Sequence, residues 1–409
     1  MPKITAQSKT FTTRKNLSLV HQYLQQAPSG DKTDGQVSLP KLNSLEALEL
    51  ALQVLLRGDF QERWEVSKIL PKLGQAVVIP LIEILDDEAA DIEARWFAGR
   101  ILGQFEQPEV VIALVKLLQN TEDEDLAAMA AQALAEIGDS AVTALQELLL
   151  QPELRLLIVQ TLSYIRRPQI VEPLLGVVQD PQPKIRAMVI EALSSFRDPR
   201  ITPVLIAALQ DISAAVRQEA VVALSFREIQ VPSAQLVWHL QPLMYDFNLQ
   251  VCQRAVTAMG RIGTDDATEA LFDLLKSPVT PTVLQIDAIR ALGWAASQSA
   301  LEYLSEILSG SQVSLCQEIV AVLGRWHCQE LRVQVSQILL DFLASEKETA
   351  QDTKVKQAAA FSLGQLGVTA AISTLEKLAT DEDSIVKLHA LSSLKKLNLA
   401  AQDVNCEFK

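Results

Sequence analysis

The residues best suited to binding chemistry are two Arg-Trp pairs with a basic residue one helical turn after each tryptophan: Arg63-Trp64, Lys68, Arg95-Trp96 and Arg100. Indole rings and basic side chains of this kind often anchor protein interfaces, because they bury large surfaces and donate hydrogen bonds. The two pairs lie 32 residues apart. The spacing predicts that they occupy equivalent places in two consecutive structural repeats.

The repeat is clearest over Asp180–Asp211, DPQPKIRAMVIEALSSFRDPRITPVLIAALQD, which is followed by DISAAVRQEAVVALS. Each unit has an Asp turn, an Ala-rich apolar helix that closes on Leu, a break, and a Leu-rich helix. The closing Leu or Met recurs at intervals averaging about 32 residues, which is typical of a helical repeat array. These residues are Leu70, Leu102, Leu134, Leu162, Leu193, Leu224, Met259, Leu292, Leu323, Leu363 and Leu394.

Eleven such units predict an all-α fold, an α-solenoid of helix pairs over residues 44–397. Residues 1–43 read as a mobile or partly docked arm with a short helix at Asn16–Gln26, and residues 398–409 as a tail. Longer units lie around 225–245 and 325–353. Four glycines that follow the repeat Leu or Met by four residues are expected to cap helices in the left-handed conformation: Gly74, Gly138, Gly263 and Gly367. Three prolines are expected in the first turn of the next helix: Pro80, Pro173 and Pro203.

Composition and charge narrow the functional classes. The chain has 409 residues, 49% of them hydrophobic but only 5% aromatic, which favours helices. The formal charge is −14; residues 1–41 carry +4, so the remainder carries −18, which disfavours nucleic-acid phosphates as partners. No transmembrane segment or signal peptide is expected. Four cysteines form no disulfide framework, so a reducing, cytoplasmic location is expected.

The motifs DPQPKIRAMVIEALSSFRDPRITPVLIAALQD, DISAAVRQEAVVALS and DFNLQVCQRAVTAMGRIGTDDATEALFDLL resemble HEAT repeats. They are similar in particular to the phycobilisome-lyase-like HEAT proteins of cyanobacteria, over roughly residues 45–397. That group includes chromophore lyases, proteins that act on phycobilisomes and plain scaffolds. The resemblance implies that the Ala-rich second helix of each pair lines a concave surface.

Helical periodicity assigns roles within the Ala-rich helix when its β-branched residue, Ile185 in the unit above, is position 0. Position 1 is a row of bases, which HEAT-like arrays pair with turn aspartates, although such a row also suits a ligand. Position 2 contains Trp64 and Trp96 and is expected to face the groove. Each tryptophan either binds a partner there or is covered by its neighbour or by the arm. Position 5 is apolar and is expected to pack on the next repeat. The alternative is that it lines an apolar groove for a helix or a tetrapyrrole.

The remaining candidate residues and motifs give weaker indications of a functional site. Cys252 and Cys316 replace bases of the position 1 row and are expected to be inert packing residues. Trp326-His327-Cys328 lacks the second ligand pair that a metal site needs. No Walker loop, GxSxG or HExxH motif occurs, and the repeated His-Glu dipeptides of a deoxyhypusine-type hydroxylase are missing. The acidic run at 121–125 is expected to cap a helix.

The leading hypothesis is a non-catalytic scaffold that binds another protein, such as a phycobiliprotein or a photosynthetic assembly, through Arg63, Trp64, Lys68, Arg95, Trp96 and Arg100. No cofactor or metal is expected. The resemblance also implies an enzymatic alternative, a bilin lyase whose groove holds an open-chain tetrapyrrole. In that case the bases would pair with propionates and the tryptophans would stack on the chromophore. The sequence leaves the oligomeric state open.

Overall fold

The computed structural model describes residues 15–20, 22, 44–227 and 231–407, with side chains as far as residue 398. All regular elements in these residues are α-helices or short 3-10 helices, which confirms the predicted all-α class. They divide between two compact units, Met1–Phe196 and Arg197–Lys409, called the N-unit and the C-unit below. Predictions for residues 1–14, 21 and 23–43 fall outside the described residues.

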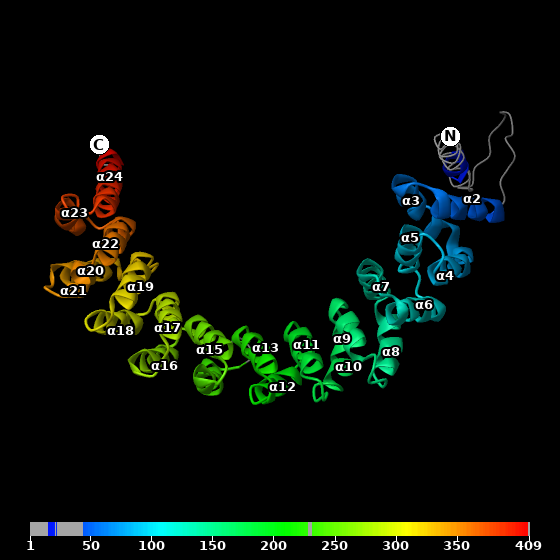
Figure 1. The fold of residues 1–409 in the computed structure, drawn as a ribbon, viewed down its shortest axis with the longest axis horizontal. Coiled ribbons are helices and arrows are strands. Elements are labelled where there is room, and N and C mark those ends of the chain that lie inside the picture. The colour runs from blue at the N-terminus through cyan, green and yellow to red at the C-terminus, as the bar shows by residue number, and fades with distance from the viewer. Residues whose placement is uncertain (1–14, 21, 23–43, 228–230, 408–409) are drawn as a thin grey trace. The chain divides into compact units, whose positions relative to one another are not determined.

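Helices of the N-unit alternate between two layers, as Figure 1 shows. The first-helix layer contains α2 (Ser44–Arg57), α4 (Val78–Asp86), α6 (Pro108–Asn120), α8 (Asp139–Leu148) and α10 (Val171–Leu175). The second-helix layer contains α3 (Phe60–Ser67), α5 (Ile92–Leu102), α7 (Glu124–Ile137), α9 (Arg155–Tyr164) and α11 (Pro183–Ser194). Two 3-10 helices, η1 (Leu70–Val77) and η2 (Pro168–Ile170), join the layers.

The C-unit continues the same alternation of layers within itself. Its first-helix layer holds α12 (Ile201–Ala208), α14 (Ser233–Leu240) with η3 (Gln241–Tyr245), α16 (Asp265–Lys276), α18 (Gln298–Leu308), α20 (Arg332–Ala344), and η4 (Thr369–Ala371) with α23 (Ile372–Leu378). Its second-helix layer holds α13 (Ala214–Ser225), α15 (Leu249–Ile262), α17 (Thr282–Ala295), α19 (Val313–Gly324), α22 (Thr353–Leu366) and α24 (Ser384–Glu407). The longer unit at 325–353 holds one more short helix, α21 (Glu348–Gln351).

The repeat leucines form the core that the sequence predicted. Ten of the eleven repeat Leu and Met side chains have an exposed fraction of 0%, and Leu394 in the last repeat is half-buried. The position 5 residues are buried as well, which confirms that they pack between repeats: Val159, Ile190, Val221, Val256, Ile289 and Val320. Neither helix of a pair could bury these residues alone, so the stacking of repeats stabilises the fold.

The predicted glycines and prolines lie at or near helix ends. All four predicted glycines have positive φ, but only Gly263 and Gly367 adopt the left-handed cap, with φ of 61° and 69°. Gly74, inside η1, and Gly138 have ψ of −155° and −121°, so the predicted left-handed cap does not form there. The three predicted prolines lie in the first turns of α4, α10 and α12. At the chain ends, a short helix over residues 15–20 docks on α2 through an Asn16–Gln53 hydrogen bond of 3.1 Å, and α24 continues past residue 398.

Two glycines near the ends of second-layer helices allow close approach to the next helix. A Cβ at Gly260 would lie 2.7 Å from the backbone of Ala291. A Cβ at Gly293 would overlap the side chain of Val322. Successive helices α15, α17 and α19 therefore pack closely at this end, and the packing depends on the missing side chains.

Candidate functional site

The two predicted tryptophans and Arg100 come together on the second-helix layer of the N-unit. The guanidinium carbon of Arg100 lies 4.5 Å from the ring centroid of Trp64 and 5.5 Å from that of Trp96. The ammonium group of Lys68 lies 5.4 Å from the Trp64 ring and 3.0 Å from the carboxylate of Glu65. Four of the six predicted residues thus form one surface, called the Trp–Arg site below.

Two neighbouring helices position this site. Asp59 caps α3 through a capping box with Glu62, which fixes the start of the helix that carries Trp64. Phe60, one turn earlier, stacks on Trp64 at 6.4 Å and contacts the buried Phe97 of α5 at 5.5 Å. The aromatic contact holds α3 and α5 in register, so that Arg100 reaches the tryptophan of the preceding repeat.

A cavity of about 230 Å³ lies beside Trp96 and Arg100, between α5 and α7. Its remaining wall comes from Met129, Gln132, Ala133 and Glu136 of α7. Met129 and Ala133 supply apolar surface, while Gln132 donates a hydrogen bond to Glu136 at 3.1 Å. The site thus combines flat aromatic faces, a guanidinium and a small amphipathic notch, which suits recognition of a side chain better than catalysis.

The sequence analysis did not include the α7 wall. Gln132 and Glu136 are the equivalents in the next repeat of Arg100 and of the residue one turn beyond it. Extending the repeat alignment by one unit would have found them. The arm was one possible cover for the tryptophans; its residues 1–14, 21 and 23–43 lie outside the described residues, and residues 15–20 dock on α2. Both indoles are half-buried.

Arg63 and Arg95 lie apart from the Trp–Arg site. Arg63 is buried, with Nη1 at 2.9 Å from Asp91 and 2.6 Å from Glu93, in the turn that begins α5. Nε of Arg95 donates to the carbonyl oxygen of Leu85 at 3.0 Å, near the end of α4. Arg63 therefore pairs with carboxylates of a turn, and Arg95 binds a carbonyl group at a helix end. The last carbonyl groups of a helix need such donors because they have no hydrogen-bond partner within the helix.

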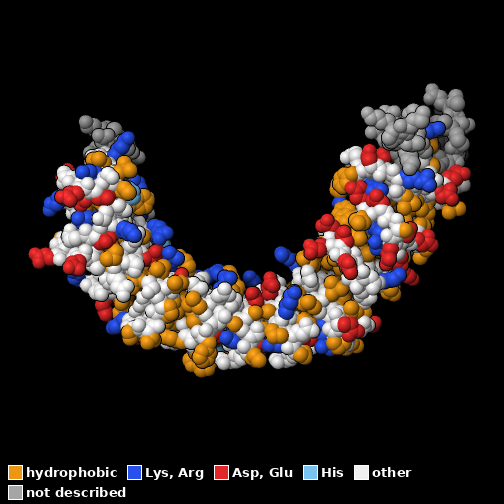
Figure 2. Space-filling model, viewed as in Figure 1, with side chains coloured by type: hydrophobic (Ala, Val, Ile, Leu, Met, Phe, Trp, Pro, Cys, Tyr) orange, Lys and Arg blue, Asp and Glu red, His pale blue; other side chains and the backbone are white. Residues whose placement is uncertain are grey.

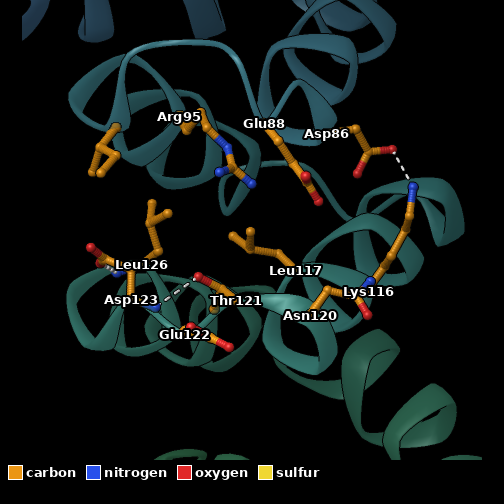
Figure 3. Close-up of a pocket in the computed structure, with 11 residues that line it drawn as sticks. Asp86, Glu88, Arg95, Lys116, Leu117, Asn120, Thr121, Glu122, Asp123 and Leu126 are labelled. Carbon is orange, nitrogen blue, oxygen red and sulfur yellow. Dashed lines mark hydrogen bonds and ion pairs between the residues drawn. The ribbon is translucent and has the colours of Figure 1, made fainter.

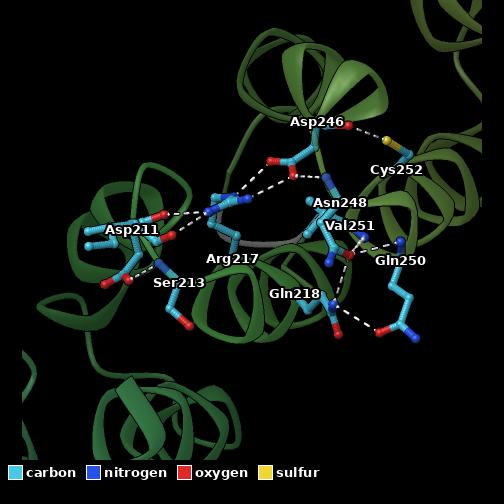
Figure 4. Close-up of polar contacts among 10 residues, drawn as sticks. Asp211, Ser213, Arg217, Gln218, Asp246, Asn248, Gln250, Val251 and Cys252 are labelled. Atoms are coloured by element: carbon cyan, nitrogen blue, oxygen red, sulfur yellow. Dashed lines mark hydrogen bonds and ion pairs between the residues drawn. The ribbon is translucent and has the colours of Figure 1, made fainter. Parts of the chain in front are cut away.

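Three further bases of the position 1 row, Arg155, Arg217 and Lys356, confirm the predicted pairing with turn aspartates, most clearly at Arg217 (Figure 4). Its Nε and Nη2 lie 2.7 Å from the two carboxylate oxygens of Asp246, and Nη1 donates to the carbonyl oxygen of Asp211 at 2.7 Å. Burial by itself would raise the pKa of Asp246. The hydrogen bonds from Arg217 and from the Asn248 N–H outweigh burial and hold that pKa below 3.8.

The two cysteines of this row take over part of the arginine role. Cys252 Sγ donates to the carbonyl oxygen of Asp246 at 3.1 Å, and Cys316 Sγ to that of Ser311 at 3.4 Å. Both thiols are buried, and burial raises the pKa of each, so they fit the predicted inert packing role. Within the described residues, Cys328 included, no group of three or more His, Cys, Asp or Glu could hold a metal ion.

A second cavity of about 370 Å³ opens at the turns of the N-unit (Figure 3). Arg95 and Glu88 extend toward its centre, and Lys116 pairs with Asp86 across one wall at 2.8 Å. Asp123 accepts a hydrogen bond from the N–H three residues on and caps α7, which confirms the predicted capping role of this acidic run. Lys116 and Asp86 thus pair between repeats, while Asp123 caps its own helix.

The described helices include none long and apolar enough to cross a membrane. In sequence, the chain matches the family of HEAT repeats over residues 78–153, 150–225, 237–324 and 339–404. A comparison with curated proteins gives no match.

Two of the matching solved structures, both of Kap95, share this architecture. The Kap95:Nup1 complex matches with a TM-score of 0.58 and 14% identity, covering 87% of this chain and 56% of that chain. Kap95p bound to RanGDP matches with a TM-score of 0.56 and 14% identity, covering 87% and 55%. Human deoxyhypusine hydroxylase matches with a TM-score of 0.28 and 20% identity, covering 66% of this chain and 99% of that chain.

This chain thus spans about half the length of the Kap95 chains, and at these identities the likeness concerns the fold alone. The family matches cover most of the chain, and the helix pairs, buried leucines and turn pairing follow one repeat throughout the described residues. The chain belongs to the HEAT-repeat family.

Proposed function

We propose that this protein is a scaffold that binds another protein at the Trp–Arg site of its N-unit. The observation that carries the proposal is the exposed guanidinium of Arg100, held by two indole rings and bonded to no carboxylate within the described residues. Its N–H donors remain available to a partner. Because the rings already order the side chain, a carboxylate or carbonyl group would bind it at a small cost in side-chain entropy.

The surroundings support a protein partner. Tryptophan and arginine are the residue types that most often dominate binding energy at protein interfaces. Two solved neighbours, the Kap95 structures with RanGDP and Nup1, are themselves complexes with proteins. The cavity beside Trp96 holds about 230 Å³, below the roughly 300 Å³ at which small-molecule sites usually begin, so it fits a side chain better than a tetrapyrrole.

The narrower predictions follow only from the sequence, either from the resemblance or, for the cytoplasmic location, from the small number of cysteines. A phycobiliprotein or photosynthetic partner, a bilin ligand, the phycobilisome-lyase-like subgroup and a cytoplasmic location all stay predictions. They do supply concrete probes for binding experiments.

The test compares the wild type with a Trp64→Ala/Trp96→Ala double variant and an Arg100→Gln variant in affinity purification with mass spectrometry. Trp238→Ala is the matched control, because Trp238 is 71% exposed on α14 in the first-helix layer of the C-unit. A partner that the wild type and the control retain, and both site variants lose, is then titrated by calorimetry. We expect the double variant to weaken binding by at least about 30-fold, the loss of a typical hot spot.

Unchanged binding by the double variant, with an unchanged helical circular dichroism spectrum, would refute the proposal. Purified phycobiliprotein and free phycocyanobilin serve as two further titrants. A red-shifted visible band that depends on Trp64 and Trp96 would favour the bilin function instead.

A further inference from the structure

A second row of binding residues runs along the second-helix layer of the C-unit. Four consecutive repeats carry, two residues after the repeat Leu or Met, an aromatic residue and an arginine in alternation: Phe226, Arg261, Trp294 and Arg325. These residues lie at the C-terminal ends of α13, α15, α17 and α19. All four are exposed; the exposed fraction is 64% for Phe226, 54% for Trp294 and 68% for the side chain of Arg325. Figure 2 shows Lys and Arg side chains recurring on this part of the C-unit.

The arginines of this row lack close carboxylate partners within the described part of the chain. Arg261 stacks on Phe226, with its guanidinium carbon 3.8 Å from the ring centroid, and makes no ion pair there. Arg325 donates to the carbonyl oxygen of Ala321 at 3.1 Å, and its nearest carboxylate, that of Glu318, is 4.0 Å away. Arg290 already binds that carboxylate at 2.8 Å.

The arrangement repeats the chemistry of the Trp–Arg site. In both places an arginine reaches back onto an aromatic ring of the preceding repeat. At Arg261 the stacking orders the guanidinium and leaves its edge free for a carboxylate, whereas Arg325 is ordered by its hydrogen bond to the carbonyl oxygen of Ala321. The row differs in extending over four repeats, so it presents two aromatic and two cationic side chains at equivalent positions of consecutive second-layer helices.

The spacing of the row suits one backbone conformation. Packed helices lie about 8–10 Å apart, and the close contacts at Gly260 and Gly293 keep α15, α17 and α19 near one another at this end. A polyproline II segment has three residues per turn and a rise of about 3.1 Å, so every third residue recurs on one face after about 9 Å. One turn of such a segment therefore matches one repeat of the row.

We propose that this aromatic–arginine row binds an extended, proline-rich acidic segment of another protein. Its acidic residues alternate with apolar residues at every third position. The carboxylates pair with Arg261 and Arg325, while the apolar side chains lie on Phe226 and Trp294. The row is a different surface from the Trp–Arg site and its assignment does not depend on that site.

Charge distinguishes this occupant from a nucleic acid. Residues 197–409 contain 18 Lys and Arg against 24 Asp and Glu, a net charge of −6. A continuous phosphate chain would meet this negative field along its whole length, whereas a peptide carries its charges only where the arginines stand.

The test measures fluorescence anisotropy of a labelled peptide, LPPDPPLPPDPPL, with the full-length protein. Control ligands are a scrambled peptide of the same composition, the peptide with Asn for Asp, and a short oligo-dT. We expect the designed peptide to bind at least about ten-fold more tightly than either control peptide, because only it can form both charge-assisted pairs in register.

Protein variants locate the binding. Arg261→Gln/Arg325→Gln and, separately, Trp294→Ala should each weaken binding of the designed peptide by about ten-fold or more. Lys276→Gln removes one positive charge on α16, in the other layer, and should have no effect. Trp64→Ala/Trp96→Ala should have no effect either. Equal binding of the scrambled peptide, no peptide binding at all, tighter binding of oligo-dT, or wild-type affinity in a folded double-Gln variant would each overturn the proposal.

Discussion

Replacement of Arg217 by methionine should destabilise the C-unit more than any change at an exposed ion pair. Arg217 and Asp246 have side-chain exposed fractions of 15% and 8%, and the variant leaves the carboxylate without its guanidinium. Removing one partner of a buried pair typically costs about 3–5 kcal/mol. Asp246 keeps the Asn248 N–H, at 2.8 Å, so we expect the lower end, about 3 kcal/mol.

The cost should depend on pH in a defined direction. The folded-state pKa of Asp246 lies below its ordinary value of 3.8, so the pair stabilises fully above that pH and loses its contribution as the pH falls through the lower folded value. Without Arg217, burial moves the pKa of Asp246 upward. The difference in stability between the wild type and Arg217→Met is therefore largest near neutral pH and shrinks on acidification.

Urea denaturation followed by circular dichroism measures this cost, with Arg200→Met as the matched control. Arg200 pairs with Asp198 at 2.8 Å on the surface of the same unit, and we expect no measurable loss there. With an m-value of about 3 kcal/mol per M, the midpoint of Arg217→Met should fall by about 1 M. Equal midpoints for the two variants, or a cost that grows below pH 4, would refute the reasoning.

Three further predictions concern other parts of the fold. Gly103→Leu would place a Cβ 2.9 Å from the backbone of α7 and should cost about 1–3 kcal/mol in a urea titration, whereas Gly310→Ala, with nothing within 4 Å, should be neutral. Gly367→Ala puts alanine at a φ of 69° and should cost about 1 kcal/mol in the same assay; a neutral result would contradict the strained cap. Cys252 should react with iodoacetamide more slowly than the half-buried Cys328, because burial raises the pKa of Cys252; equal labelling rates by mass spectrometry would contradict this.

The fold could be predicted from the sequence because its determinants are local or periodic. A leucine such as Leu193 recurs once per repeat because each second helix buries the same face. The side chain of Leu193 is fully buried, as this periodicity predicts. Gly263 and Pro203 mark helix ends through backbone conformation, which depends on the residue itself. The turn pairing could be predicted too, since Arg217 and Asp246 occupy fixed positions in consecutive repeats.

The site was harder, because it depends on contacts between helices. Trp64 and Arg100 lie 36 residues apart, and helical periodicity orders residues on one helix without fixing the register of the next. The sequence placed Arg63 and Arg95 with the tryptophans because they are adjacent in the chain. A rotation of about 100° per residue instead directs them to the turns. The cavity against α7 depends on the distance between packed helices, which cannot be predicted from the separation of residues along the sequence.

The close contacts at Gly260 and Gly293 give the C-unit two kinds of joint between repeats. Charge couples neighbouring repeats at Arg217–Asp246, Arg290–Glu318 and Lys356–Asp381, and α15, α17 and α19 also meet through tight packing at their ends. Salt screens the more exposed pair Arg290–Glu318 more than the buried Arg217–Asp246, while cooling weakens the apolar contacts as the hydrophobic driving force declines. Ionic strength and temperature therefore weaken different contacts between the repeats of the C-unit, and between α17 and α19 they weaken different contacts of the same pair of helices.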